Sequence, residues 1–125
     1  MSINYHKKTF KSIANSDNGE VGEQTIFHYQ QQGNFVWAEY SGGAIVKGFL
    51  VAKVIENDTL DMRYEHINTT CEIMTGLCLS RPETLLDGRI RLYEKWQWTS
   101  GDLSSGESII EEIIQENFVK SGNFA

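Results

Sequence analysis

The stretch IRLYEKWQW, residues 90–98, decides the fold because its side chains alternate in character. A period of two residues is typical of a β-strand that buries one face, since successive side chains point to opposite sides of a sheet. Glu94 shares the apolar face unless a bulge shifts the register, so the pattern predicts a carboxylate that points inward. The apolar face carries Ile90, Leu92, Trp96 and Trp98, and the opposite face carries Arg91, Tyr93, Lys95 and Gln97.

Three further stretches predict strands by the same alternation. The first two stretches, at 25–29 and 60–66, are short and carry a polar residue at nearly every second position. The third, AIVKGFLVAKVI at 44–55, is apolar on both sides. The predicted inward faces are Thr25, Phe27 and Tyr29 in the first; Leu60, Met62, Tyr64 and His66 in the second; and Val46, Gly48, Leu50, Ala52 and Val54 in the third.

Turn-forming residues separate these segments at short intervals. Seven clusters rich in Gly, Asn, Asp and Ser, from SDNGE at 16–20 to SGDLSSGE at 100–107, imply eight segments. The segment at 108–116 fits either an amphipathic helix or an eighth strand, and the strand is favoured because it closes the sheet and leaves no open edge. The predicted fold is therefore all-β, an eight-stranded antiparallel up-and-down barrel in a single domain over 1–125, with the barrel at about 8–115 and a tail at 117–125.

Composition narrows the classes of partner. The net charge of −6 argues against a surface for nucleic acid or anionic membrane, because such partners require a basic field. No apolar run is long enough to span a bilayer and the first residues lack the apolar core of a signal peptide, so we expect a cytoplasmic protein. Cys71 and Cys78, interpreted as members of one strand, would lie about 23 Å apart at ~3.3 Å per residue, too far for a disulfide.

The candidate binding site is the inward face of this barrel. An inward carboxylate must be paired, neutralised or exposed to a wet cavity, and Tyr29, Tyr64 and His66 are the candidate donors for Glu94. The sequence carries no cofactor motif, and its three histidines lack the spacing of a metal site, so neither cofactor nor metal is predicted. The predicted ligand-binding residues are Glu94, Trp96, Trp98, Tyr64, His66 and Tyr29.

Two alternatives to a site for a small, partly apolar molecule remain open. The tryptophans fit a filled core as simply as a ligand wall, which would make the chain an interaction module that forms a homodimer through its barrel faces. The cavity could instead serve a small enzyme in which Glu94 and His66 act as an acid and base pair, although no catalytic residue is assigned.

Four stretches resemble the avidin-like domain family of short bacterial proteins, many of which bear the name N-acetylglutamate synthase. The resemblance covers roughly 8–115 and implies an avidin- or lipocalin-like barrel. That name implies an acetyltransferase, which needs a glycine-rich pyrophosphate loop; QQQGNF at 30–35 begins such a pattern but ends in Phe35, where a small residue is required, so we do not expect this activity. The stretches are VWAEYSGGAIVKG (36–48), LDMRYEHIN (60–68), DGRIRLYEKWQWTSGD (87–102) and GESIIEEI (106–113).

Overall fold

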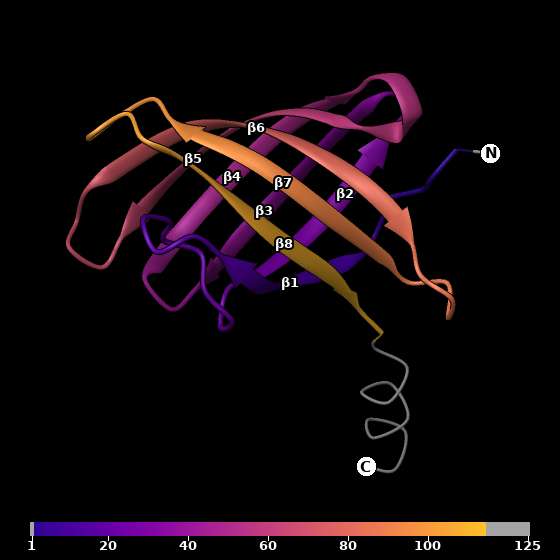
Figure 1. Cartoon of the computed structure of the whole chain (residues 1–125), viewed down its shortest axis with the longest axis horizontal. Coiled ribbons are helices and arrows are strands. Elements are labelled where there is room, and N and C mark those ends of the chain that lie inside the picture. The colour runs from indigo at the N-terminus through magenta and orange to yellow at the C-terminus, as the bar shows by residue number, and fades with distance from the viewer. Residues whose placement is uncertain (1, 115–125) are drawn as a thin grey trace, which may run out of the picture.

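The computed structural model describes residues 2–114 and confirms the predicted fold, a closed antiparallel barrel of eight strands (Figure 1). Each strand pairs with the next along the chain, and β8 pairs with β1 to close the sheet. No helix in the described part is long and apolar enough to cross a membrane. The elements are β1 Thr9–Asn15, β2 Ile26–Gln32, β3 Phe35–Gly42, β4 Ile45–Val54, the short 3₁₀ turn η1 Glu56–Asp58, β5 Leu60–Asn68, β6 Ile73–Thr84, β7 Ile90–Trp98 and β8 Ser105–Ile113.

The last strand resolves the ambiguity at 108–113, whereas residues 115 and 116 lie outside the described residues. β8 runs to Ile113 as a strand and pairs with β7 on one side and β1 on the other, so both of its edges are satisfied. Ser108, Ile110 and Glu112 face inward in alternation. The predicted tail at 117–125 lies outside the described residues.

The inward face of β4 differs from the prediction at its first residues. Ile45 is buried, whereas Val46 is 57% exposed. The register of β4 against β5 shifts between Ile45 and Lys47, and an extra residue at such a bulge reverses the side to which its neighbours point. From Gly48 onward the predicted face is buried, as the period of two requires.

The placement of Cys71 in a strand is also wrong. Cys71 lies in the turn between β5 and β6 with a φ of 64°, and it is exposed. Cys78 is buried in β6, and both thiols are unpaired.

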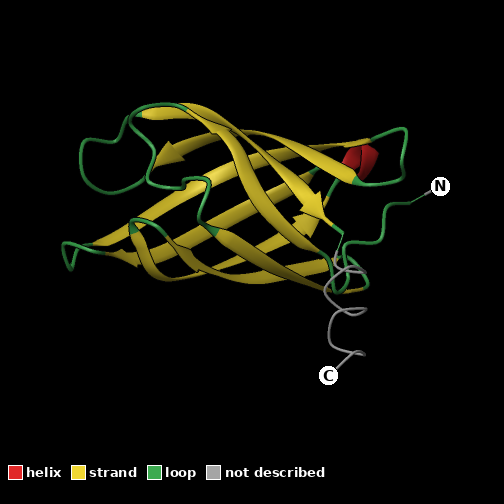
Figure 2. Cartoon of the chain, turned by 90° about the horizontal axis from the view of Figure 1, so that it is seen from below, coloured by secondary structure: helices red, strands yellow, loops and turns green. Residues whose placement is uncertain are grey.

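One end of the barrel is filled with side chains. Tyr5, from the segment before β1, is completely buried there, and its hydroxyl donates to the carbonyl of Asp58 at 2.6 Å. The amino-terminal segment and η1 lie at this same end (Figure 2), which we call the closed end. The buried side chains that pack behind Tyr5 include Phe10, Tyr29, Leu60, Leu92 and Ile110.

The other end, the mouth, has glycines on its inward face. In three places an aromatic ring lies over a glycine that is its register partner on the next strand, in the space that a Cβ would occupy. Glycine therefore sets how close each ring comes to the barrel wall, as in the aromatic rescue of strand glycines. The pairs are Tyr40 over Gly48, Tyr64 over Gly76, and Trp96 over Gly106.

We expect Gly48→Ala to destabilise the barrel by about 1–3 kcal/mol, the usual cost of overpacking. The new methyl group would overlap the Tyr40 ring and lie 2.8 Å from the Cβ of His66, which cannot move without its strand. Urea unfolding measures the change, and Gly22→Ala is the matched control because nothing lies within 4 Å of its added Cβ. An equal cost for the two variants would contradict the role assigned to Gly48.

Candidate functional site

A cavity of about 50 Å³ lies in the mouth half of the barrel. The aromatic residues of the glycine pairs form much of its wall, and the segment between β1 and β2 covers it. Five of the six predicted site residues line it: Glu94, Trp96, Trp98, Tyr64 and His66. Tyr29 is absent from the lining.

Glu94 points into the barrel from the middle of β7, as predicted. Its two carboxylate oxygens accept hydrogen bonds from the hydroxyls of Ser80, at 2.8 Å, and Ser108, at 3.0 Å. These serines are its register partners on the flanking strands β6 and β8, so the polar group is a row across three strands. Burial raises the pKa of the Glu94 carboxyl from 4.5 to about 7, although the two serine bonds oppose that rise.

The donors expected from the sequence do not bond to Glu94. Tyr29 packs against Phe10, with ring centroids 4.8 Å apart, and its hydroxyl is the one buried side-chain polar atom among the described residues without a hydrogen-bond partner. Burial raises the pKa of Tyr29, and the nearby charge of Glu94 raises it further. Tyr29 therefore belongs to the packed closed end, within electrostatic reach of the carboxylate.

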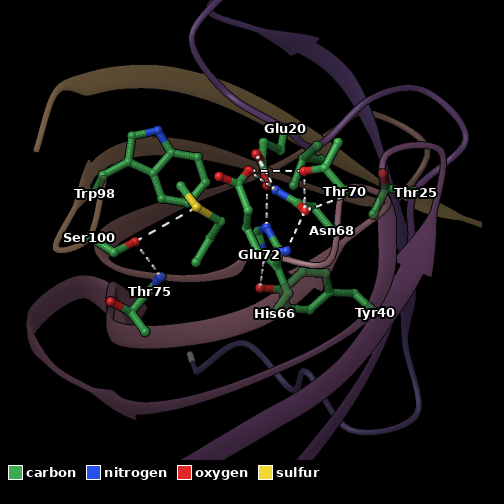
Figure 3. Close-up of polar contacts among 12 residues, drawn as sticks. Glu20, Thr25, Tyr40, His66, Asn68, Thr70, Glu72, Thr75, Trp98 and Ser100 are labelled. Atoms are coloured by element: carbon green, nitrogen blue, oxygen red, sulfur yellow. Dashed lines mark hydrogen bonds and ion pairs between the residues drawn. The ribbon is translucent and has the colours of Figure 1, made fainter. Parts of the chain in front are cut away.

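His66 belongs to a separate polar network at the mouth (Figure 3). Its Nδ1 lies 2.9 Å from the Tyr40 hydroxyl and its Nε2 lies 2.7 Å from Oε1 of Glu20. The donor and acceptor roles of the two ring nitrogens depend on the tautomer: with the proton on Nε2, the ring donates to Glu20 and Nδ1 accepts from Tyr40. Both ring nitrogens are thus occupied, and no hydrogen bond joins His66 to Glu94 as an acid and base pair.

The segment 16–25, which we call the mouth loop, is fastened to the cavity walls. The indole N–H of Trp98 donates to the carbonyl of Asn18 at 3.0 Å, and that of Trp96 donates to Oδ1 of Asn15 at the end of β1, at 3.2 Å. The second oxygen of Glu20 accepts from the side-chain amide of Asn68 at 3.0 Å. The loop therefore closes the cavity through contacts with its lining residues.

Aromatic rings meet edge to face around the cavity. The ring of Trp98 lies 5.9 Å from Tyr64 and 5.8 Å from His66, both at steep angles. Trp96 lies 5.5 Å from Trp98. Such contacts hold the rings in fixed orientations, so the wall is preorganised.

Several residues that line the cavity or bond to Glu94 were missed from the sequence. Tyr40 was within reach, because it continues the alternation of Val36 and Ala38. Ser80 and Ser108 become recognisable only when the register places them beside Glu94. Glu20 lies in a loop, where no periodic pattern indicates direction.

The glycine-containing stretch at 30–35 forms a hairpin. Gly33 has a φ of 59° in the turn between the antiparallel strands β2 and β3. This stretch therefore does not form a pyrophosphate-binding loop at the start of a helix. Within residues 2–114, no group of three or more His, Cys, Asp or Glu side chains is arranged to hold a metal ion.

The fold and the cavity define a class: a closed up-and-down barrel with an aromatic, carboxylate-bearing interior under one loop. The chain belongs to the avidin-like protein family, whose model matches residues 3–113 and thus all eight strands. No curated protein and no solved structure matches the chain.

We expect Glu94→Gln to stabilise the barrel increasingly as pH rises. Between pH 4.5 and about 7 the folded protein binds more protons than the unfolded chain, so the native free energy of unfolding falls across this window and levels off above it. A pKa raised from 4.5 to about 7 corresponds to a gain on the order of 3 kcal/mol above neutrality, and little below pH 4.5.

Urea unfolding across this pH range measures the difference between the two proteins. Glu65→Gln, on the exposed face of β5, is the matched control and should show no such trend. A constant difference between native and Glu94→Gln proteins at every pH would refute the buried-carboxylate account.

Proposed function

We propose that this protein binds a small, partly apolar molecule in the barrel cavity. The observation that carries the proposal is Glu94: a carboxylate set among side chains that leave space beside it, with a pKa raised to about 7. A carboxylate has about four acceptor positions and the serines use two, so acceptor capacity remains for a ligand.

The wall residues have different roles in the proposed recognition of a ligand. Tyr64, Trp96 and Trp98 supply apolar faces, and His66 holds the mouth loop through Glu20. The Tyr29 hydroxyl lies outside the lining. We propose that it contributes to the site through its electrostatic interaction with Glu94. The aromatic wall and the Glu94 carboxylate inside the barrel would together orient a ligand that has an apolar part and a hydrogen-bond donor.

The small volume of the cavity limits ligand size. About 50 Å³ is far below the roughly 300–1,000 Å³ of sites that hold drug-sized ligands. A molecule of many atoms therefore enters only when the mouth loop moves away.

A screen of small metabolites tests the proposal through thermal shift and tryptophan fluorescence. A ligand should raise the unfolding temperature and change the emission of Trp96 and Trp98, because both indoles line the cavity and Trp98 also holds the mouth loop through Asn18. Glu94→Gln should remain folded and lose the response, whereas Glu65→Gln should keep it. Hits that bind Glu94→Gln as well as the native protein would count against this site.

We also propose that two copies pair through the outer face of β3 and β4. Phe35, Phe49 and Val51 are 69%, 54% and 63% exposed, and Trp37 lies beside Val51 as its register partner. Contiguous exposed apolar side chains of this kind mark protein interfaces. An ion pair between Lys47 and Glu39, 2.6 Å long, borders the patch, and in a two-fold pair each charge can meet its opposite on the other copy.

Analytical ultracentrifugation tests the pairing. The native chain should sediment as a dimer and Val51→Glu as a monomer, because the new carboxylate would be buried without a partner. Leu79→Glu, on the exposed face of β6, is the control and should leave the dimer intact. A native chain that stays monomeric at every concentration would exclude the interface.

A further inference from the structure

The charged groups that line the cavity are unbalanced. Glu94 and Glu20 are its carboxylates and His66 is its histidine, and no lysine or arginine of the described chain is among the lining residues. His66 and Glu20 bond to each other, so a proton on the imidazole is matched by that carboxylate. The charge of Glu94 is matched by nothing but two neutral hydroxyls.

The aromatic wall adds potential of the same sign. The faces of tyrosine and tryptophan rings are electron-rich and attract cations within about 6 Å. Tyr64, Trp96 and Trp98 stand around the cavity with centroids 5.5–5.9 Å from their neighbours, so a group placed there lies near more than one ring. An anion in the same place would be repelled by the Glu94 carboxylate.

We infer that the cavity takes a small organic cation, an alkylammonium group, between the Glu94 carboxylate and the rings of Tyr64, Trp96 and Trp98. This inference rests on the proposed function and names the chemical class of its ligand. An ammonium brings donors for the acceptor positions that the serines leave unused, and its alkyl part packs on the rings. No covalent step is involved.

The size of the cavity selects the probe. A water molecule needs about 10–15 Å³ of such space, so about 50 Å³ holds roughly three to five atoms other than hydrogen. The n-propylammonium ion fits this limit with four such atoms. Propan-1-ol has the same number without the charge, and acetate has the same number with the opposite charge.

The first experiment compares these three probes on the native protein by tryptophan fluorescence and thermal shift above neutral pH. We expect n-propylammonium to bind in the millimolar range, as its few atoms allow, and at least tenfold more tightly than propan-1-ol. Acetate should show no response. Glu94→Gln should reduce the affinity for n-propylammonium to that for propan-1-ol, whereas Glu65→Gln should leave it unchanged.

The second experiment varies pH, because the cation requires ionised Glu94. With a pKa of about 7, the affinity for n-propylammonium should fall about tenfold from pH 8 to pH 6, while the probe itself stays protonated. The other titratable groups that face Glu94 are Tyr29, Tyr40, Tyr64 and Cys78, whose pKa values are raised by burial and which stay protonated over this range.

The histidine at the mouth needs its own control, since His66 lines the same cavity as Glu94. The pH dependence should persist in His66→Gln and vanish in Glu94→Gln. Loss of the dependence in His66→Gln would assign it to the mouth network and overturn the role of Glu94.

Two outcomes would overturn the cation inference and differ in their meaning for the proposed function. Equal or tighter binding of propan-1-ol would show that the cavity binds ligands but does not select a cation. No response to n-propylammonium or to propan-1-ol, together with a metabolite hit that depends on Glu94, would show that the cavity is a binding site for ligands of another chemical class.

Discussion

Closure of the sheet between β1 and β8 is the constraint on which the rest of the molecule depends. It removes both sheet edges and creates an interior whose width is fixed by eight strands, just enough to be packed solid or to hold one small ligand. At each position along the barrel axis, the size of the inward side chains then decides whether the interior is packed or holds a cavity. The closed end is packed around Tyr5, whereas the mouth half carries Gly48, Gly76 and Gly106 opposite aromatic rings. Drawing those rings toward the wall leaves space at the centre, so the cavity follows from where the chain places side-chain volume.

Glu94 makes the folded barrel less stable than an apolar side chain at the same position would. A leucine at this position would fill space as Leu92 does on the same strand, and replacing buried charge with apolar side chains is often neutral or stabilising. The chain instead holds a carboxylate and supplies it with Ser80 and Ser108, which satisfy it only in part. Such a cost in stability is consistent with the proposed function, because proteins commonly break local rules at functional sites.

Local alternation was enough to predict the fold and the direction of Glu94, Trp96 and Trp98, since the period of a strand is set by the backbone alone. It failed at Val46, where a bulge inserts one residue and reverses the face. It could not supply the partners of Glu94, because Ser80 and Ser108 are neighbours through register, which depends on the whole barrel. Nor could it find Glu20, whose position is set by a loop. Five of the six predicted site residues reach the cavity, and Tyr29 was assigned to it only because alternation gives the face of a residue and not its depth.

Trp98 is both part of the cavity wall and a contact that holds the mouth loop, so in the proposed function ligand entry is coupled to that loop. Trp98 donates to the carbonyl of Asn18, and Glu20 is held by His66 and Asn68, so these three hydrogen bonds are among those that break when the loop lifts. At about 1 kcal/mol each, these three alone cost about 3 kcal/mol, or roughly two orders of magnitude in affinity for any molecule that keeps the loop open. A ligand that fits under the closed loop bears this cost only during entry. Selection for small ligands therefore comes from the loop as much as from the volume of the cavity.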